Sequence, residues 1–188
     1  MSKRRKRGEP DDEDLRVARR GATLLLRLHD REVQVLQWVF ADLERLLEDG
    51  SPGDPVRERL FPRAYLDPTE ESAESEWQSI VHGDLVETRR AALRVVVAGL
   101  GGATETAAGS GMREVVLDEA QAEQWLGVLN DARLAFGTAL GVTAESEVED
   151  IEPDDPRVEG YAVYDWLTHL VAAFLSSLSE PDDGDDQL

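Results

Sequence analysis

Two long amphipathic stretches in the second half of the chain constrain its fold more than any other feature of the sequence. They run from Val115 to Val142 and from Val158 to Leu178, and in both the apolar residues recur every three or four positions. This spacing places the apolar side chains on one face of an α-helix, so each stretch is expected to bury that face. The expected core-facing residues are Ala122, Trp125, Leu126, Leu129, Arg133, Phe136 and Leu140 in the first helix and Val163, Leu167, Leu170, Val171, Phe174 and Leu178 in the second.

The first of these helices has clear signals at both ends. Asp118 precedes it, and Gln121 stands at the position from which a side chain bonds back to the capping residue. Gly141 follows its last apolar residue, as is common where a helix ends. We expect the two helices to pack against each other, with Trp125 and Phe136 against Val163, Leu167 and Phe174.

The first half of the chain indicates further helices and a small sheet. An apolar stripe at helical spacing follows Asp30 and predicts a helix to about Glu48, and Arg57–Phe61 has room for one helical turn. Asp67-Pro68 starts a helical pattern that extends to Ala98, and Gly83 in its middle leaves one helix and two helices equally open. Residues rich in Val, Leu and Thr predict strands at Leu15–Arg19, Ala22–Leu28 and Arg113–Leu117, the last pairing with the second.

The expected fold is therefore mainly α, of the α+β class. It is a single-domain bundle of four to six helices with a two- or three-stranded sheet, occupying residues 14–179. Charged residues without apolar partners predict disordered tails at 1–13 and 180–188, and Gly99–Gly111 and the acidic run 142–155 are expected to be a surface loop and a solvated linker.

The net charge of −20 is unevenly distributed along the chain. The first 20 residues contain eight Lys/Arg and five Asp/Glu, whereas the other 168 contain 12 Lys/Arg and 35 Asp/Glu. A body this acidic repels a phosphate backbone. Contact with nucleic acid would have to come from the basic cluster near the start of the chain, which consists of Lys3, Arg4, Arg5, Lys6 and Arg7.

Several function classes find no support in the sequence. The chain has no cysteine, which excludes disulfides, thiolate metal sites and thiol nucleophiles within these residues. His29, His82 and His169 share no metal-binding motif, and no nucleophile elbow or phosphate loop is present. The basic start is not followed by an apolar segment, and no apolar run is long enough to span a bilayer. We expect a cytoplasmic protein that is not an enzyme and has no cofactor, bound metal or membrane contact.

Polar residues on the two C-terminal helices are the candidate site residues. Tyr161, Asp165 and His169 are spaced i, i+4, i+8 and so share one side of the last helix. We expect Arg133 to pair with Asp165 across the helix interface, where a buried pair would fix the packing register. The full candidate set is Trp125, Asn130, Asp131, Arg133, Tyr161, Asp165, Trp166 and His169.

The same two helices carry a family resemblance. The run LDEAQAEQWLGVLNDARLAFGTALGV and the later YAVYDWLTHLVAAFL resemble an actinobacterial domain-of-unknown-function family whose members are described as AosR-type oxidative-stress transcription regulators. The likeness extends more weakly to RGATLLLRLHDREVQVLQWV and covers about residues 15–178. It implies regulation through protein contact, with a sigma factor or RNA polymerase as partner, and no enzymatic activity.

The combined prediction is a non-enzymatic regulator that acts by contacting other proteins. Redox sensing in such regulators would use a cysteine pair, and this chain has none, so a thiol switch within these residues is excluded. Two alternatives stay open. One is a DNA-binding regulator that uses the N-terminal basic cluster, and the other is an enzyme with a site near Tyr161, Asp165 and His169. The sequence does not indicate an oligomeric state.

Overall fold

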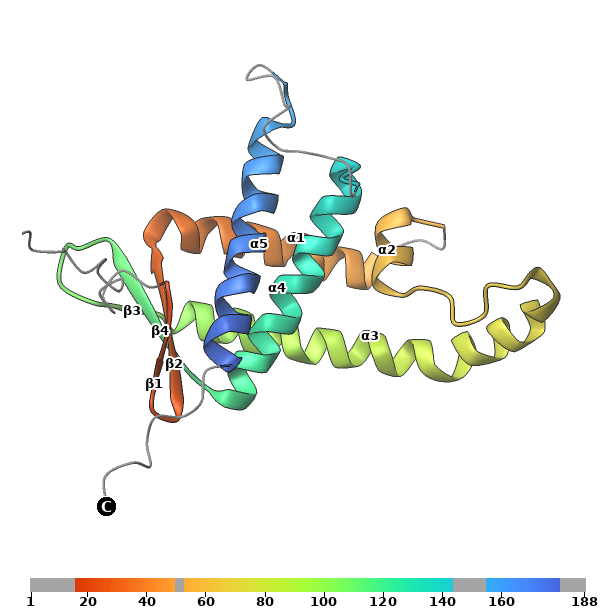
Figure 1. The fold of residues 1–188 in the computed structure, drawn as a ribbon, viewed down its shortest axis with the longest axis horizontal. Helices are drawn as coiled ribbons and strands as arrows, with labels where there is room; N and C mark the ends of the chain where they lie inside the picture. Colours follow the sequence, from red (N-terminus) through yellow and green to blue (C-terminus); the bar gives the residue numbers. More distant parts are fainter. Residues whose placement is uncertain (1–15, 50–52, 144–154, 180–188) are drawn as a thin grey trace, which may run out of the picture.

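The helices lie on one side of a small antiparallel sheet. The computed structural model describes residues 16–49, 53–143 and 155–179. The predicted tails at 1–13 and 180–188, the basic cluster and most of the predicted acidic linker lie outside these residues. Figure 1 shows the sheet nearly edge-on, with α1, α3, α4 and α5 to one side of it. This arrangement confirms the predicted α+β class.

The sheet has the strand order β1-β2-β4-β3 and every pairing in it is antiparallel. Strands β1 (Val17–Arg20) and β2 (Thr23–His29) form a hairpin in which Gly21, at φ +57°, supplies the left-handed position of the turn. Strand β4 (Met112–Asp118) pairs with β2 along its whole length, as predicted. Strand β3 (Thr104–Glu105) adds a fourth strand within the segment that was expected to be a surface loop.

Side chains of the sheet alternate between the helices and the opposite face. Leu24, Leu26 and Leu28 of β2 point toward the helices and are fully buried. Val115 and Leu117 of β4 extend the same apolar surface. These leucines and valines form the platform on which the helices pack.

Helix α1 (Asp30–Asp49) starts where β2 ends, and its apolar stripe faces the core as predicted. The buried stripe residues are Leu36, Val39, Phe40, Leu43 and Leu47. Helix α2 (Pro55–Leu60) follows, capped by the Asp54 side chain, which accepts from the N–H groups of Val56 and Arg57. The connector between α2 and the next helix, residues 61–67, has Leu66 82% exposed.

Helix α3 (Glu71–Gly101) is one continuous helix, preceded by a short 3-10 turn, η1 (Pro68–Glu70), that Asp67 caps. Gly83 does not interrupt it, and a β-carbon at that position would meet no atom within 4 Å. The N-terminal part of α3 extends away from the rest of the molecule (Figure 1). The sequence was compatible with one helix or with two. The structure has one, because helical hydrogen bonding continues through Gly83 at a modest cost in free energy.

Helices α4 (Glu119–Leu140) and α5 (Val158–Ser179) pack along each other and complete the core. The predicted ends of α4 are confirmed: Asp118 and Gln121 form a reciprocal capping box, and Gly141 is left-handed at φ +72°. The pairing of Trp125 with Phe174 is also confirmed, with parallel rings 6.3 Å apart. Phe136 was expected to face α5, and it contacts the ring of Trp38 on α1 instead.

The end of α5 returns to the first strand of the chain. Ser177 is buried, and its hydroxyl donates to the carbonyl of Val17 at 3.2 Å. The Ser177 carbonyl accepts from Nε of Arg19 at 3.1 Å. This pair of hydrogen bonds ties the last helix to the edge of the sheet.

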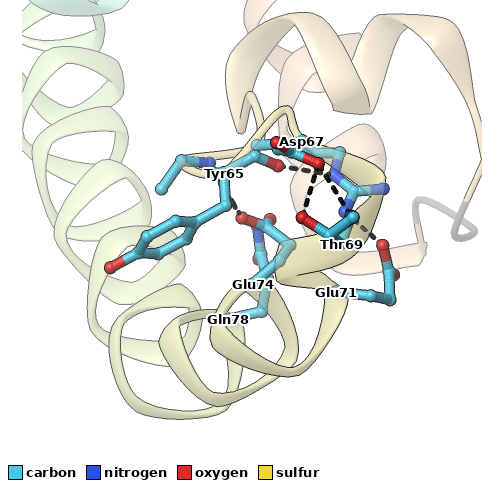
Figure 2. A network of polar contacts seen from close by, with 8 residues as sticks. Tyr65, Asp67, Thr69, Glu71, Glu74 and Gln78 are labelled. Atoms are coloured by element: carbon cyan, nitrogen blue, oxygen red, sulfur yellow. Dashed lines mark hydrogen bonds and ion pairs between the residues drawn. The ribbon is translucent and has the colours of Figure 1, made fainter.

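A buried carboxylate holds the connector against the start of α3 (Figure 2). Glu74 accepts from the N–H groups of Ala64 and Tyr65, at 3.0 and 2.8 Å, and from the side-chain amide of Gln78 at 2.7 Å. These hydrogen bonds, led by that from Gln78, lower the pKa of Glu74. A buried carboxylate is stable only with such donors, so Glu74 determines how the connector lies.

Glycine 137 permits the close approach of α4 and α5, because a β-carbon there would lie 2.8 Å from a ring carbon of Tyr164. Gly127, on the same helix, has open space around it. We expect Gly127→Ala to raise the free energy of unfolding by about 1 kcal/mol through helix propensity. Gly137→Ala should lower it by about 1 kcal/mol, because overpacking outweighs the same propensity gain. Urea denaturation measures both, and a stabilised Gly137→Ala would contradict the assigned contact.

Removal of the Glu74 carboxylate should release the connector while the core stays folded. We expect the amides of Ala64 and Tyr65 to exchange with solvent about tenfold faster in Glu74→Ala. Because the pKa of Glu74 is lowered, its stabilising effect is present at neutral pH and is lost as the pH falls through that lowered value. Hydrogen exchange measured by NMR tests this, with the Leu26 amide as internal reference and Glu76→Ala, an exposed neighbour, as matched control. Equal exchange in the two variants would refute the role of Glu74.

Candidate interaction groove

The predicted site residues do not come together in one place. Trp125 is buried at the centre of the core, 1% exposed. Tyr161 is also buried, and its hydroxyl donates to the carbonyl of Leu140 at 3.2 Å. Asp165 and His169 lie on the outer surface of α5, with side chains 53% and 75% exposed. Their helical spacing is as predicted, but the tyrosine points inward and the other two point to solvent.

The predicted pair of Arg133 and Asp165 is wrong. Nη2 of Arg133 donates to Oδ1 of Asn130 on its own helix at 2.9 Å, and Asp165 faces His169 at 3.4 Å. The ion pair between helices is formed by other residues. Nε of Arg89 on α3 lies 3.0 Å from Oδ2 of Asp131 on α4. The rotation of α4 about its axis points Asp131 toward α3, and sequence spacing does not determine that rotation.

Two buried N–H groups in this region have no hydrogen-bond partner within the described residues. They are Nε of Arg133 and Nε1 of Trp166. Both side chains are partly buried. Trp166 packs against the apolar core.

A groove between α1 and the C-terminal half of α4 is the candidate site. Its volume is about 520 Å³. On the α1 side, Trp38, Asp42, Arg45, Leu46 and Asp49 recur at helical spacing and face the groove. Val39 and Leu43 of the buried stripe also line it.

Small side chains on α4 make this groove hollow. Ala132, Ala135 and Ala139 line it, and Phe136 and Leu140 are the large side chains on that side. The Trp38 and Phe136 rings meet edge to face across the groove, 5.5 Å apart. Trp38 is nevertheless 54% exposed. A half-exposed tryptophan over an apolar hollow is typical of a protein-binding site.

Acidic residues surround the open side of the groove. Asp42 pairs with Arg45 at 2.8 Å, so these two charges compensate each other. Asp49 has no ion-pair partner among the described residues, and Asp54 bonds only to backbone N–H groups of α2. The groove therefore combines an apolar floor with a net negative margin.

A second cavity lies under the connector, between α2 and the start of α3. Its volume is about 620 Å³. Its polar groups bond mostly to one another: Nη2 of Arg57 lies 2.6 Å from Nε2 of His82, and Arg63 contacts Glu71. Burial, and then the charge of Arg57, lower the pKa of His82, so the ring accepts this hydrogen bond in its neutral form. Because the polar side chains of this cavity already bond to one another, we favour the apolar groove between α1 and α4 as the binding site.

The groove could not be predicted from the sequence alone, although one signal was present. Trp38 stands beside the apolar stripe of α1 and not within it. A large aromatic residue just outside a core stripe indicates an exposed contact surface when the facing helix carries alanines. The position of Trp38 opposite the alanines of α4 becomes visible only in the tertiary structure, where α1 and α4 lie together.

In the described part of the chain, no helix combines the length and hydropathy that a bilayer span requires. The described residues also contain no group of three or more His, Asp or Glu in a metal-binding arrangement.

Comparison with known proteins supplies a family. The model of a domain of unknown function, DUF2017, matches residues 12–178. The chain is also 29% identical over 130 residues to proteins of Mycobacterium tuberculosis and Mycobacterium bovis, each named "Oxidative stress regulator AosR". These alignments cover 63% of this chain and 56% of each relative, so the chain spans little more than half the length of those relatives. No solved structure matches the chain significantly.

The ion pair of Arg89 and Asp131 gives a direct test of the helix arrangement. Burial raises the pKa of Asp131, and the charge of Arg89 opposes that effect. Arg89→Met keeps an aliphatic side chain near the Phe61 ring and leaves the carboxylate without its cation. We expect the free energy of unfolding to fall by about 2 kcal/mol. Adding Asp131→Asn should restore at least half of this loss in chemical denaturation. If the double variant is no more stable than the single one, the pair does not act as assigned.

Proposed function

Since the chain belongs to the DUF2017 family, we propose that it is a non-enzymatic regulatory protein that acts by binding another protein. The names of the similar mycobacterial proteins support a regulatory role. The observation that carries the protein-contact part is the groove between α1 and α4, with the half-exposed Trp38 at its margin. In this proposal the protein works in the cytoplasm and its partner belongs to the transcription machinery, as a sigma factor or RNA polymerase, which the family resemblance implies.

The chemistry of the groove favours binding over catalysis. Its floor consists of alanine, valine, leucine and aromatic side chains, and its charged residues lie at the margin. General acid or base catalysis requires a titratable group beside the reacting atoms. An apolar hollow with an exposed aromatic side chain is suited to receive apolar side chains of a partner.

The chain contains no cysteine, which limits how it could respond to an oxidant. No thiol in these 188 residues is available for oxidation. We therefore propose that the oxidant acts on another component and that this chain transmits its effect through the groove. Regulation then depends on occupancy of the groove and not on a covalent change in this chain.

Replacing the chromosomal copy with Trp38→Ala in the native host tests the proposal. We expect the transcript changes after peroxide treatment to match those of a gene deletion, because the variant loses the main anchor of the contact. RNA sequencing measures them, and immunoblotting checks that the protein accumulates to its normal level.

The matched control is Ile80→Ala on α3. Ile80 is also an exposed apolar residue, at 66%, and it lies outside the groove. This variant should retain the wild-type transcript response. A wild-type response in Trp38→Ala at normal protein level would refute a regulatory role for the groove.

A further inference from the structure

We propose that the groove between α1 and α4 binds an amphipathic helix of a partner protein, with Lys or Arg residues flanking its apolar face. This inference rests on the proposed function and adds the chemistry of the partner. Three properties of the described residues carry it: the shape of the groove, its charge, and the charge of the chain as a whole.

The shape of the groove fits a helix. Helices α1 and α4 form two of its walls, Asp54 and Val56 at the start of α2 also line it, and the apolar lining recurs at helical spacing along α1 and α4. On α4 the lining residues stand at i, i+3, i+4, i+7 and i+8, from Ala132 to Leu140. A helix laid between two such walls presents apolar residues at i, i+3 or i+4, and i+7, which is the common mode of helix-in-groove recognition.

The charge of the groove favours a basic partner. The groove lies at the C-terminal ends of both α1 and α4, since Asp49 and Leu140 line it. Helix C-termini carry partial negative charge, and neither helix has a basic residue in its last turn. Arg90 of α3 donates to the Leu47 carbonyl and so offsets part of this charge at the end of α1. Asp54 bonds to N–H groups at the start of α2. Asp49 has no ion-pair partner among the described residues, so its carboxylate is the one that Lys or Arg of a partner would neutralise.

The total charge disfavours a second copy of this chain as the occupant. Residues 21–188 contain 12 Lys/Arg and 35 Asp/Glu, so two bodies repel each other. The basic cluster at Lys3–Arg7 has the required sign, but it contains no apolar side chain to fill the groove. A phosphate backbone is repelled for the same reason as a second copy. A basic and apolar segment of a different protein satisfies both requirements of the groove.

A titration with a synthetic peptide tests this inference on the full chain. The probe is an amidated peptide of about 16 residues made of leucine and lysine, with the leucines on one helical face. A second peptide has the same composition in an order that gives no apolar helical face, and a third has glutamate in place of lysine. NMR titration of the isotope-labelled protein reports where and how tightly each one binds.

We expect only the first peptide to shift the amides along the groove-facing sides of α1 and α4 and the indole signal of Trp38. Trp38→Ala should weaken its binding about 30-fold, as for a central aromatic anchor. Asp49→Lys should weaken it about fivefold. Glu76→Lys, which makes the same change in net charge on α3, should leave it within about twofold.

Three outcomes would overturn the inference. They are equal binding of the faceless peptide, shifts that map outside the groove, and equal effects of Asp49→Lys and Glu76→Lys. This titration uses purified protein, whereas the proposed function is tested by transcripts in cells. A Trp38→Ala strain that mimics the deletion, together with a peptide that does not bind in the groove, would refute the helix partner and leave the regulatory function standing.

Discussion

The packing of Trp125 is the interaction on which the remaining structure depends. Its ring comes from α4, stacks on Phe174 of α5 and meets Phe40 of α1 edge to face at 6.1 Å. Gly99 of α3 lies against the same ring, where a β-carbon would be 3.5 Å from the indole nitrogen. One side chain therefore sets the spacing of four helices over the sheet. A core of this density tolerates little change in volume, so the helix positions are determined together.

The groove follows from the same geometry. Near Trp125 the space between α1 and α4 is filled by aromatic rings, whereas toward the C-terminal end of α4 the lining includes three alanines beside Phe136 and Leu140. The upper ends of α4 and α5 extend past α1 in Figure 1. With small residues on one wall and Trp38 on the other, the two helices enclose a hollow that the chain itself does not fill. The same helix pair thus provides both the core and the candidate binding surface.

The electrostatics divide between internal and external roles. Inside, Arg89 neutralises Asp131, and Glu74 is held by backbone and amide donors. At the groove, Asp49 has no such partner among the described residues. Carboxylates that serve the fold are thus paired, and Asp49 at the groove margin stays available for a basic partner. This difference between paired and unpaired carboxylates is the physical basis for the proposed contact.

Elements whose causes are local could be predicted from the sequence alone. Helical periodicity predicted the buried faces of α1 and α5 and the first half of that of α4, up to Leu129. In the second half of α4, Arg133, Phe136 and Leu140, which were expected to be buried, are not among the buried residues, and Ala132 is buried instead. The Asp118–Gln121 box and Gly141 marked the ends of α4, and the pairing of β2 with β4 followed from two apolar β-branched or leucine-rich runs. Which side chains meet between helices depends on the tertiary packing. It paired Asp131 with Arg89, turned Phe136 toward Trp38 and left Asp165 in solvent. Helical periodicity specifies the buried face of a helix only to within a broad sector. The individual contacts between helices depend on how neighbouring helices rotate and cross, which the side-chain volumes around Trp125 determine.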